Sequence, residues 1–209
     1  MLKTQGKIQA LQQILNSSGR FLLVTAFGLW LGAILFLGYG VAPVNFGIAE
    51  DWQLEGNRPG NGEAVTSYRA IGGTLTAESI ERLNHIELAA IVMAALGFSL
   101  FWIQRRNRTV WLIAETLLFT VIILIYAIYS QKIGGQLDEL RMAGTIDFSV
   151  TDDAAKSADH LTFDRLHQRY TMLTGFNVIL ILLELLIISF KPSLRPFGRF
   201  YLNKADAEE

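Results

Sequence analysis

Four long apolar stretches with almost no charge constrain the fold of this chain more than any other feature. They run over residues 21–42, 86–103, 110–130 and 172–190. The hydrocarbon core of a bilayer is about 30 Å thick and is crossed by roughly 20 residues of helix. A span must be a helix or part of a closed barrel, because lipid cannot satisfy backbone polar groups. A barrel strand would alternate apolar and polar residues. The sequence therefore predicts an all-α integral membrane four-helix bundle.

The distribution of basic residues predicts that both termini are cytoplasmic. The segments before the first stretch, between the second and third, and directly after the fourth are rich in lysine and arginine. The two long connections, 43–85 and 131–169, carry an excess of acidic residues. Short connections rich in lysine and arginine stay in the cytoplasm. We therefore expect an N-in, C-in protein of the bacterial inner membrane, with helical extensions and two loops on the external side.

Three segments follow from this pattern. Residues 1–19 place apolar side chains at helical spacing beside lysines, which is typical of an amphipathic helix lying on the inner leaflet. Residues 20–190 form the transmembrane domain, and residues 191–209 a cytoplasmic tail.

Several helix boundaries can be predicted from capping and breaking residues. Pro43 is expected to end the first span, since the residue before a proline disfavours helical geometry. Thr76 is the expected N-cap of a second helix that begins outside the lipid. Gly134 and Gly135 are expected to break the third helix before a short amphipathic helix over 136–143. The fourth helix is expected to begin near 152–159.

Some residues in the spans are candidates for helix packing. Gly28 and Gly32 form a small-xxx-small pair, which lets two helix backbones approach closely. Asn177, in the fourth span, is expected to form a hydrogen bond between helices rather than to ligate an ion.

Residues in the first and last spans resemble a known family. They are Leu29, Trp30, Leu31, Gly32, Phe36, Val41, Ala42, Pro43 and Phe46, followed by Phe163, Leu166, His167, Tyr170 and Asn177. In this order they resemble the transmembrane protein 205-like family, a bacterial domain-of-unknown-function family of four-helix membrane proteins. The resemblance covers about Arg20 to Ile188 and implies the four-helix fold without a settled activity; the chain departs from it in an enlarged loop at 50–70. The architecture is more remotely similar to copper-resistance protein D and membrane protoporphyrinogen oxidases.

The three histidines of the chain all fall on the predicted external side. The candidate metal ligands are His85, His160, Asp164 and His167. The last three are spaced i, i+4, i+7 and share one helix face. Imidazole and carboxylate together suit zinc, copper, nickel or iron, and imidazole also suits haem. The alternative is that Asp164 pairs with Arg165 or Arg169 and that the histidines form hydrogen bonds at the membrane interface.

Three acidic residues lie within or beside the apolar stretches. Glu87 stands at the edge of the second stretch. Glu115 and Glu184 lie inside the third and fourth, at similar depth in the inner half of the membrane. Ionisable residues inside a span mark functional sites by default. Glu115 and Glu184 could share a proton or cation, or each could be a carboxyl bonded to a neighbouring hydroxyl or backbone carbonyl.

Other functional classes have no support in the sequence. The chain has no cysteine, so disulfides and thiolate metal sites are excluded. Phosphate-binding loops and catalytic triads are not visible, no catalytic residue is identified, and nothing indicates nucleic-acid binding. The partners expected are the lipid bilayer and other membrane proteins or further copies of the chain. Three hypotheses remain: an accessory or scaffold subunit, a small ion or solute transporter using Glu115 and Glu184, and a haem- or metal-binding redox protein using the external histidines.

Overall fold

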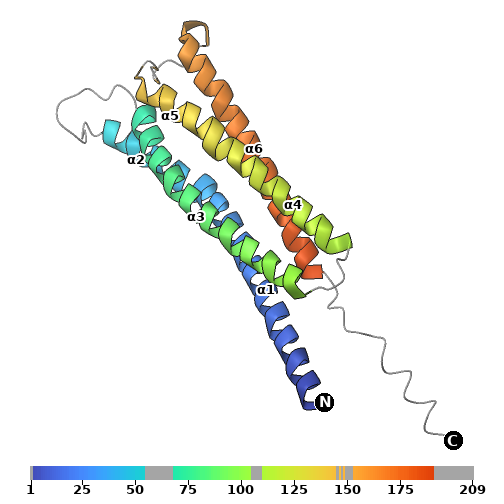
Figure 1. Ribbon diagram of the computed structural model, residues 1–209. Coiled ribbons are helices and arrows are strands. Elements are labelled where there is room, and N and C mark those ends of the chain that lie inside the picture. Colours follow the sequence, from blue (N-terminus) through green and yellow to red (C-terminus); the bar gives the residue numbers. More distant parts are fainter. Residues whose placement is uncertain are drawn as a thin grey trace, which may run out of the picture.

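The protein is an all-α bundle built around four long helical rods, as its sequence predicts. The computed structural model describes residues 2–54, 68–104, 110–144, 146, 148 and 153–190. Within them, four continuous helical rods are long and apolar enough to cross a membrane: Ala10–Ala49, Ile71–Ile103, Val110–Met142 and Ala158–Phe190. Figure 1 shows the four rods side by side along one common direction. This is a multi-pass membrane protein.

The first rod passes through Pro43 without ending. It consists of α1 (Leu2–Phe36), the π-helix η1 (Leu37–Val41) and α2 (Ala42–Leu54). In η1 the N–H of Ala42 bonds to the carbonyl of Leu37, five residues earlier. A proline lacks the N–H donor of a helical residue and clashes with the carbonyl four residues before it. The wider π turn directly before Pro43 accommodates that defect within a continuous helix, so the expected stop at Pro43 is wrong.

The helix expected over residues 1–19 is present but is not a separate element. α1 runs unbroken from Leu2 through the first span (Figure 1). Gly19 is the first buried residue of this helix among those whose side chains are described. The segment before Gly19 therefore continues in the direction of the span and does not form a separate helix with another axis.

The second rod, α3 (Tyr68–Gln104), begins earlier than its sequence suggests. Thr76 was expected to cap it, yet Thr76 lies two turns inside the helix. There its hydroxyl accepts a hydrogen bond from the Asn45 amide at 3.4 Å. The same amide lies 3.5 Å from the Ser79 hydroxyl. These polar contacts join α2 to α3 beyond the apolar part of the bundle.

The third rod also passes through its expected breaking point. It consists of α4 (Val110–Tyr126), the π-helix η2 (Ala127–Ile133) and α5 (Gly134–Met142). Gly134 has helical dihedral angles and begins α5. The helix over 136–143 is thus the end of this rod and not an independent element. The chain leaves it at Gly144, whose φ of +67° favours glycine.

The fourth rod, α6 (Ala158–Phe190), follows the short 3-10 helix η3 (Asp153–Ala155). The Ser157 hydroxyl accepts a hydrogen bond from the His160 N–H at 3.1 Å, the contact of an N-cap residue. The predicted start near 152–159 is confirmed by this cap. α6 packs along α4 and η2 and also meets α1, while α1 and α2 pack along α3.

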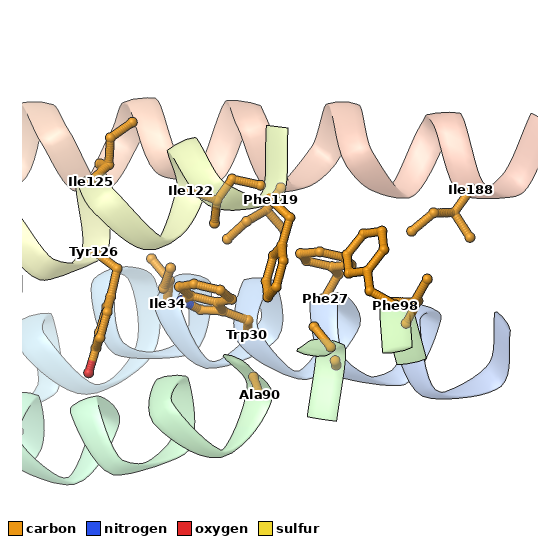
Figure 2. Packing of buried hydrophobic residues seen from close by; sticks show 14 of the residues in the cluster. Phe27, Trp30, Ile34, Ala90, Phe98, Phe119, Ile122, Ile125, Tyr126 and Ile188 are labelled. Carbon is orange, nitrogen blue, oxygen red and sulfur yellow. The ribbon is translucent and has the colours of Figure 1, made fainter. Parts of the chain in front are cut away.

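One level of the bundle is filled by phenylalanines, which we call the aromatic layer: Phe27, Phe98 and Phe119 (Figure 2). The Phe27 and Phe119 rings meet edge to face at 5.8 Å, and the Phe98 and Phe119 rings stack at 5.0 Å. All three side chains are buried. They come from three different rods, so this layer holds α1, α3 and α4 together by packing of apolar rings.

The close approach of two helix backbones occurs at Gly19 and Gly97. A Cβ on Gly97 would lie 2.9 Å from Leu23 Cγ and 3.0 Å from the Gly19 carbonyl oxygen. Only glycine at position 97 therefore allows α1 and α3 this spacing. Gly28 and Gly32, the pair predicted for packing, are exposed, and a Cβ on either would meet nothing within 4 Å. The packing prediction for this pair is not met inside the chain.

Candidate functional site: a buried polar junction of four helices

Each of the four rods contributes one fully buried polar or amphipathic residue to a single cluster, which we call the polar junction: Trp30, Glu87, Tyr129 and Asn177. All four have an exposed fraction of 0%. They lie on α1, α3, η2 and α6 respectively. A carboxyl group enclosed by four apolar helices is costly and is found in membrane spans chiefly where it serves a function.

The hydrogen bonds of the junction converge on one oxygen of Glu87. Its Oε1 accepts a bond from the Trp30 indole N–H at 2.8 Å and one from the Tyr129 hydroxyl at 2.6 Å. Both bonds are buried and link α3 to two other rods. The Asn177 amide lies next to the Tyr129 hydroxyl, without a hydrogen bond of good geometry. Glu87 is thereby held in a fixed position by donors from α1 and η2.

A second set of contacts surrounds these four residues with aromatic rings and hydroxyls. Tyr126 meets Trp30 and Tyr129 edge to face, at 5.8 and 5.6 Å between ring centroids. Tyr129 in turn meets Tyr170 of α6 at 5.3 Å. The Ser130 hydroxyl donates to the Asn84 side-chain oxygen at 3.1 Å. The aromatic rings therefore place apolar surface around the buried carboxyl group.

The π-helix η2 explains how one rod supplies so many of these groups. Tyr129, Ser130 and Ile133 of η2 are all buried, directly after the buried Tyr126. An inserted residue widens the helical turn and shifts which side chains face inward. Adjacent residues 129 and 130 can then both face the bundle interior. Such π turns are frequent at functional sites.

Several buried polar atoms at this level have no hydrogen-bond partner among the residues the structure describes. They are Glu87 Oε2, the Asn177 Oδ1 and Nδ2 atoms, and the Thr174 hydroxyl oxygen. Thr174 and Asn177 are three residues apart on α6 and so lie on one face of that helix. No described lysine, arginine or histidine forms an ion pair with Glu87. A buried polar group without a partner costs free energy, so the junction favours a proton, a cation or water that would complete these atoms.

The two predicted ion-binding carboxyls lie beyond the aromatic layer from the junction. Glu115 is 2% exposed and Glu184 0%. Tyr129 and Tyr170 are in contact, and each glutamate lies fourteen residues from its tyrosine on two antiparallel helices. At 1.5 Å per residue both carboxyls therefore sit about 21 Å from the tyrosine pair, at one level. The similar depth predicted for them agrees with this register.

The predicted metal ligands are not brought together. His85 is exposed on α3, and His167 is exposed on α6 with its ring stacked on Phe163. His160 Nε2 lies 3.9 Å from Asp164 Oδ1, and Lys156 binds the other oxygen of that carboxylate at 2.7 Å. Among the described residues, no group of three or more histidine, cysteine, aspartate or glutamate side chains is placed to hold a metal. The same part of the chain thus offers no assembled metal site for the redox hypothesis.

Reasoning from the sequence missed the residue at the centre of the junction. Glu87 stands at the edge of an apolar stretch, where a carboxyl would normally reach water. A helical projection shows that Leu83, Glu87, Ala90 and Ala94 share one face, and all four are buried. This i, i+4, i+7, i+11 spacing is the signal that would have identified Glu87 as inward-facing. The sequence singles out Trp30 only through the family resemblance and does not single out Tyr129.

Comparisons with known proteins add no relative. No protein-family model matches the chain. No curated protein and no solved structure matches it either.

Proposed function

We propose that this protein is a small cation-translocating membrane protein in which Glu87 is the charged ion-binding group. The observation that carries the proposal is the Glu87 carboxyl itself: it is fully buried, fixed by Trp30 and Tyr129, and has no basic partner among the described residues. An ionised carboxylate at this place needs a counter-charge or a full set of donors, because an isolated buried charge is costly. A transported proton or cation would supply that charge transiently.

The position of the other acidic residues supports a path through the bundle. Glu115 lies one helical turn beyond Phe119 of the aromatic layer, and Glu184 lies at the level of Glu115. The aromatic layer separates these two carboxyls from Glu87. Two acidic levels with an apolar barrier between them suit an ion that pauses on each side of a closed gate. We call Glu115 and Glu184 the inner station, because they would bind the proton or cation in the inner half of the membrane, as the sequence suggests.

The charge distribution supports the orientation and the location of the protein. The basic residues around positions 3, 7, 20 and 105–108 favour cytoplasmic termini in a bacterial inner membrane. In this orientation the polar junction faces the external side and the inner station faces the cytoplasm. We also propose, from the residues of the first and last spans, that the chain is related to the transmembrane protein 205-like family.

The test is cation flux into proteoliposomes. Purified protein is reconstituted at known density, and influx of protons, sodium and potassium is followed with trapped fluorescent indicators under an imposed gradient. We expect flux of at least one of these ions above that of empty vesicles, and its loss in Glu87→Gln. The matched control is Glu81→Gln, which neutralises an exposed carboxyl on the same helix. Equal flux in Glu87→Gln and the wild type contradicts the proposal.

A second candidate function is an accessory or scaffold subunit, favoured by the exposed Gly28 and Gly32 face of α1. Nothing in the described chain covers this face. A neighbouring helix could approach it closely. Replacing both glycines by leucine should then release a co-purifying membrane protein, or convert an oligomer to a monomer, without unfolding the chain. An unchanged size and composition of the detergent-solubilised particle contradicts the scaffold function.

A further inference from the structure

A proton alone would not provide a partner for every unpartnered atom of the polar junction. Protonation adds one hydrogen to Glu87, which can be donated to one neighbouring oxygen and leaves the other oxygen without a partner. Three oxygens require a partner at this level: Glu87 Oε2, Asn177 Oδ1 and Thr174 Oγ1. They comprise a carboxylate, an amide and a hydroxyl oxygen. This is a ligand set for hard cations, which prefer oxygen over nitrogen or sulfur.

Tyr129 brings the Glu87 carboxyl and the Asn177 amide close together, and Thr174 is their neighbour on α6. Glu87 Oε1 is 2.6 Å from the Tyr129 hydroxyl, and the Asn177 amide lies beside that same hydroxyl. Thr174 stands about one helical turn from Asn177 on the same face of α6. Both donors to Glu87 bind its Oε1, which leaves Oε2 open to a ligand. Asn177 is the independent observation that points to a ligand, since it has no exposed surface and neither amide atom forms a hydrogen bond of good geometry with a described residue.

Charge balance selects the valence of the ion. Glu87 is the acidic member of the junction, and no described basic side chain pairs with it. A monovalent cation makes the buried site neutral, whereas a divalent cation leaves an uncompensated positive charge in a low-dielectric interior. The rings of Trp30, Tyr126 and Tyr170 pack around Tyr129 and so place apolar surface beside the carboxyl group.

We propose that the polar junction is a binding site for one alkali cation of the sodium class, ligated by Glu87, Asn177 and Thr174. This inference names the ion of the proposed function and rests on it. Trp30 and Tyr129 are positioning residues, since they hold the carboxylate through Oε1 and do not themselves touch the ion. Binding of the cation by ionised Glu87 satisfies the oxygens that the fold leaves open.

The test is calorimetric titration of sodium chloride into the purified full-length protein, with choline chloride holding ionic strength constant. We expect saturable binding of a single sodium ion per chain in the wild type and none in Glu87→Gln. Asn177→Leu and Thr174→Val should each weaken binding by about tenfold or more, which is a loss of about 1.4 kcal/mol. Thr174→Ser, which keeps the hydroxyl, should restore it. Thr171→Val is the matched control, because the Thr171 hydroxyl bonds only to the backbone of its own helix and is exposed.

The outcomes separate this inference from the proposed function. If Asn177→Leu does not fold, the Thr174→Val and Thr174→Ser pair carries the test. No saturable sodium binding in the wild type, together with proton flux that depends on Glu87, overturns the sodium site and leaves cation translocation standing; the open atoms then hold water only. Saturable sodium binding without flux of any ion keeps the site and overturns translocation. Binding that is unchanged in Glu87→Gln overturns the site outright.

Discussion

The polar junction and the aromatic layer lie in the same bundle, about 15 Å apart at 1.5 Å per residue between Tyr129 and Phe119, but they are built on opposite principles. The aromatic layer consists of apolar rings from three rods in direct contact. The polar junction contains hydrogen bonds that link three rods, a buried amide from the fourth rod, and several polar atoms without partners among the described residues. The rings of the layer need no further partner, whereas the junction leaves polar atoms without one among the described residues. We infer that stability resides mainly in the first and ion chemistry in the second.

The largest stability effect is expected in the aromatic layer. Phe119→Ala removes the ring that contacts both Phe27 and Phe98 and leaves a cavity, which costs about 3–5 kcal/mol in well-packed interiors. Unfolding in mixed detergent micelles, followed by circular dichroism, measures this loss. A Phe119→Ala protein as stable as the wild type would show that the aromatic layer is not the main source of stability.

The closest helix approach should be the next most sensitive position. Gly97→Ala places a Cβ 2.9 Å from Leu23 Cγ and 3.0 Å from the Gly19 carbonyl. Overpacking of this kind costs about 1–3 kcal/mol. Gly28→Ala, where a Cβ meets nothing within 4 Å, is the control and should leave stability unchanged. Equal unfolding midpoints for the two variants would show that α1 and α3 are not held together at Gly97.

In the junction, a substitution should reduce cation flux strongly and the free energy of unfolding only slightly. Tyr129→Phe removes one of two donors to Glu87 Oε1, and a hydrogen bond inside a membrane protein contributes about 0.6–1.7 kcal/mol. Cation flux should nevertheless fall several-fold, because the carboxyl loses its fixed position. Tyr39→Phe, at an 85% exposed position, is the control. A Tyr129→Phe protein with wild-type flux would separate the hydroxyl from ion binding.

The smallest effect is expected at the edge of the junction. Ser130→Ala removes the hydrogen bond to the Asn84 side chain but leaves Glu87 and its two donors intact. We expect a loss of about 0.6 kcal/mol, the average for such bonds in membrane proteins, and flux close to that of the wild type. Flux that falls as far as in Tyr129→Phe would extend the functional site to Ser130 and Asn84.

The sequence predicts the spans because continuous apolar character and charge-poor length are properties of single segments. Pro43, Gly134 and Thr76 were misjudged for a shared reason: local breaking and capping preferences are weak against a π turn or a tertiary contact. The π-helices before Pro43 and Gly134 keep each rod continuous. A hydrogen bond from Asn45, on another helix, engages Thr76 inside α3.

The candidate site was only partly predictable, because it depends on which residues of different spans meet. Glu115, Glu184 and Asn177 stand out within apolar runs, and all three are buried. Glu87 stands at the end of a run, and only its helical phase distinguishes it from an interfacial carboxyl. Its pairing with Trp30 and Tyr129 joins residues 57 and 42 positions away in the chain, which no single segment records.

The most direct test of the account is the initial rate of cation flux through Glu87→Gln, compared with Glu81→Gln at equal amounts of folded, reconstituted protein. The account predicts that Glu87→Gln falls to the rate of empty vesicles while Glu81→Gln retains the wild-type rate. If the two variants carry cations equally fast, Glu87 is a structural group and the polar junction is not an ion site.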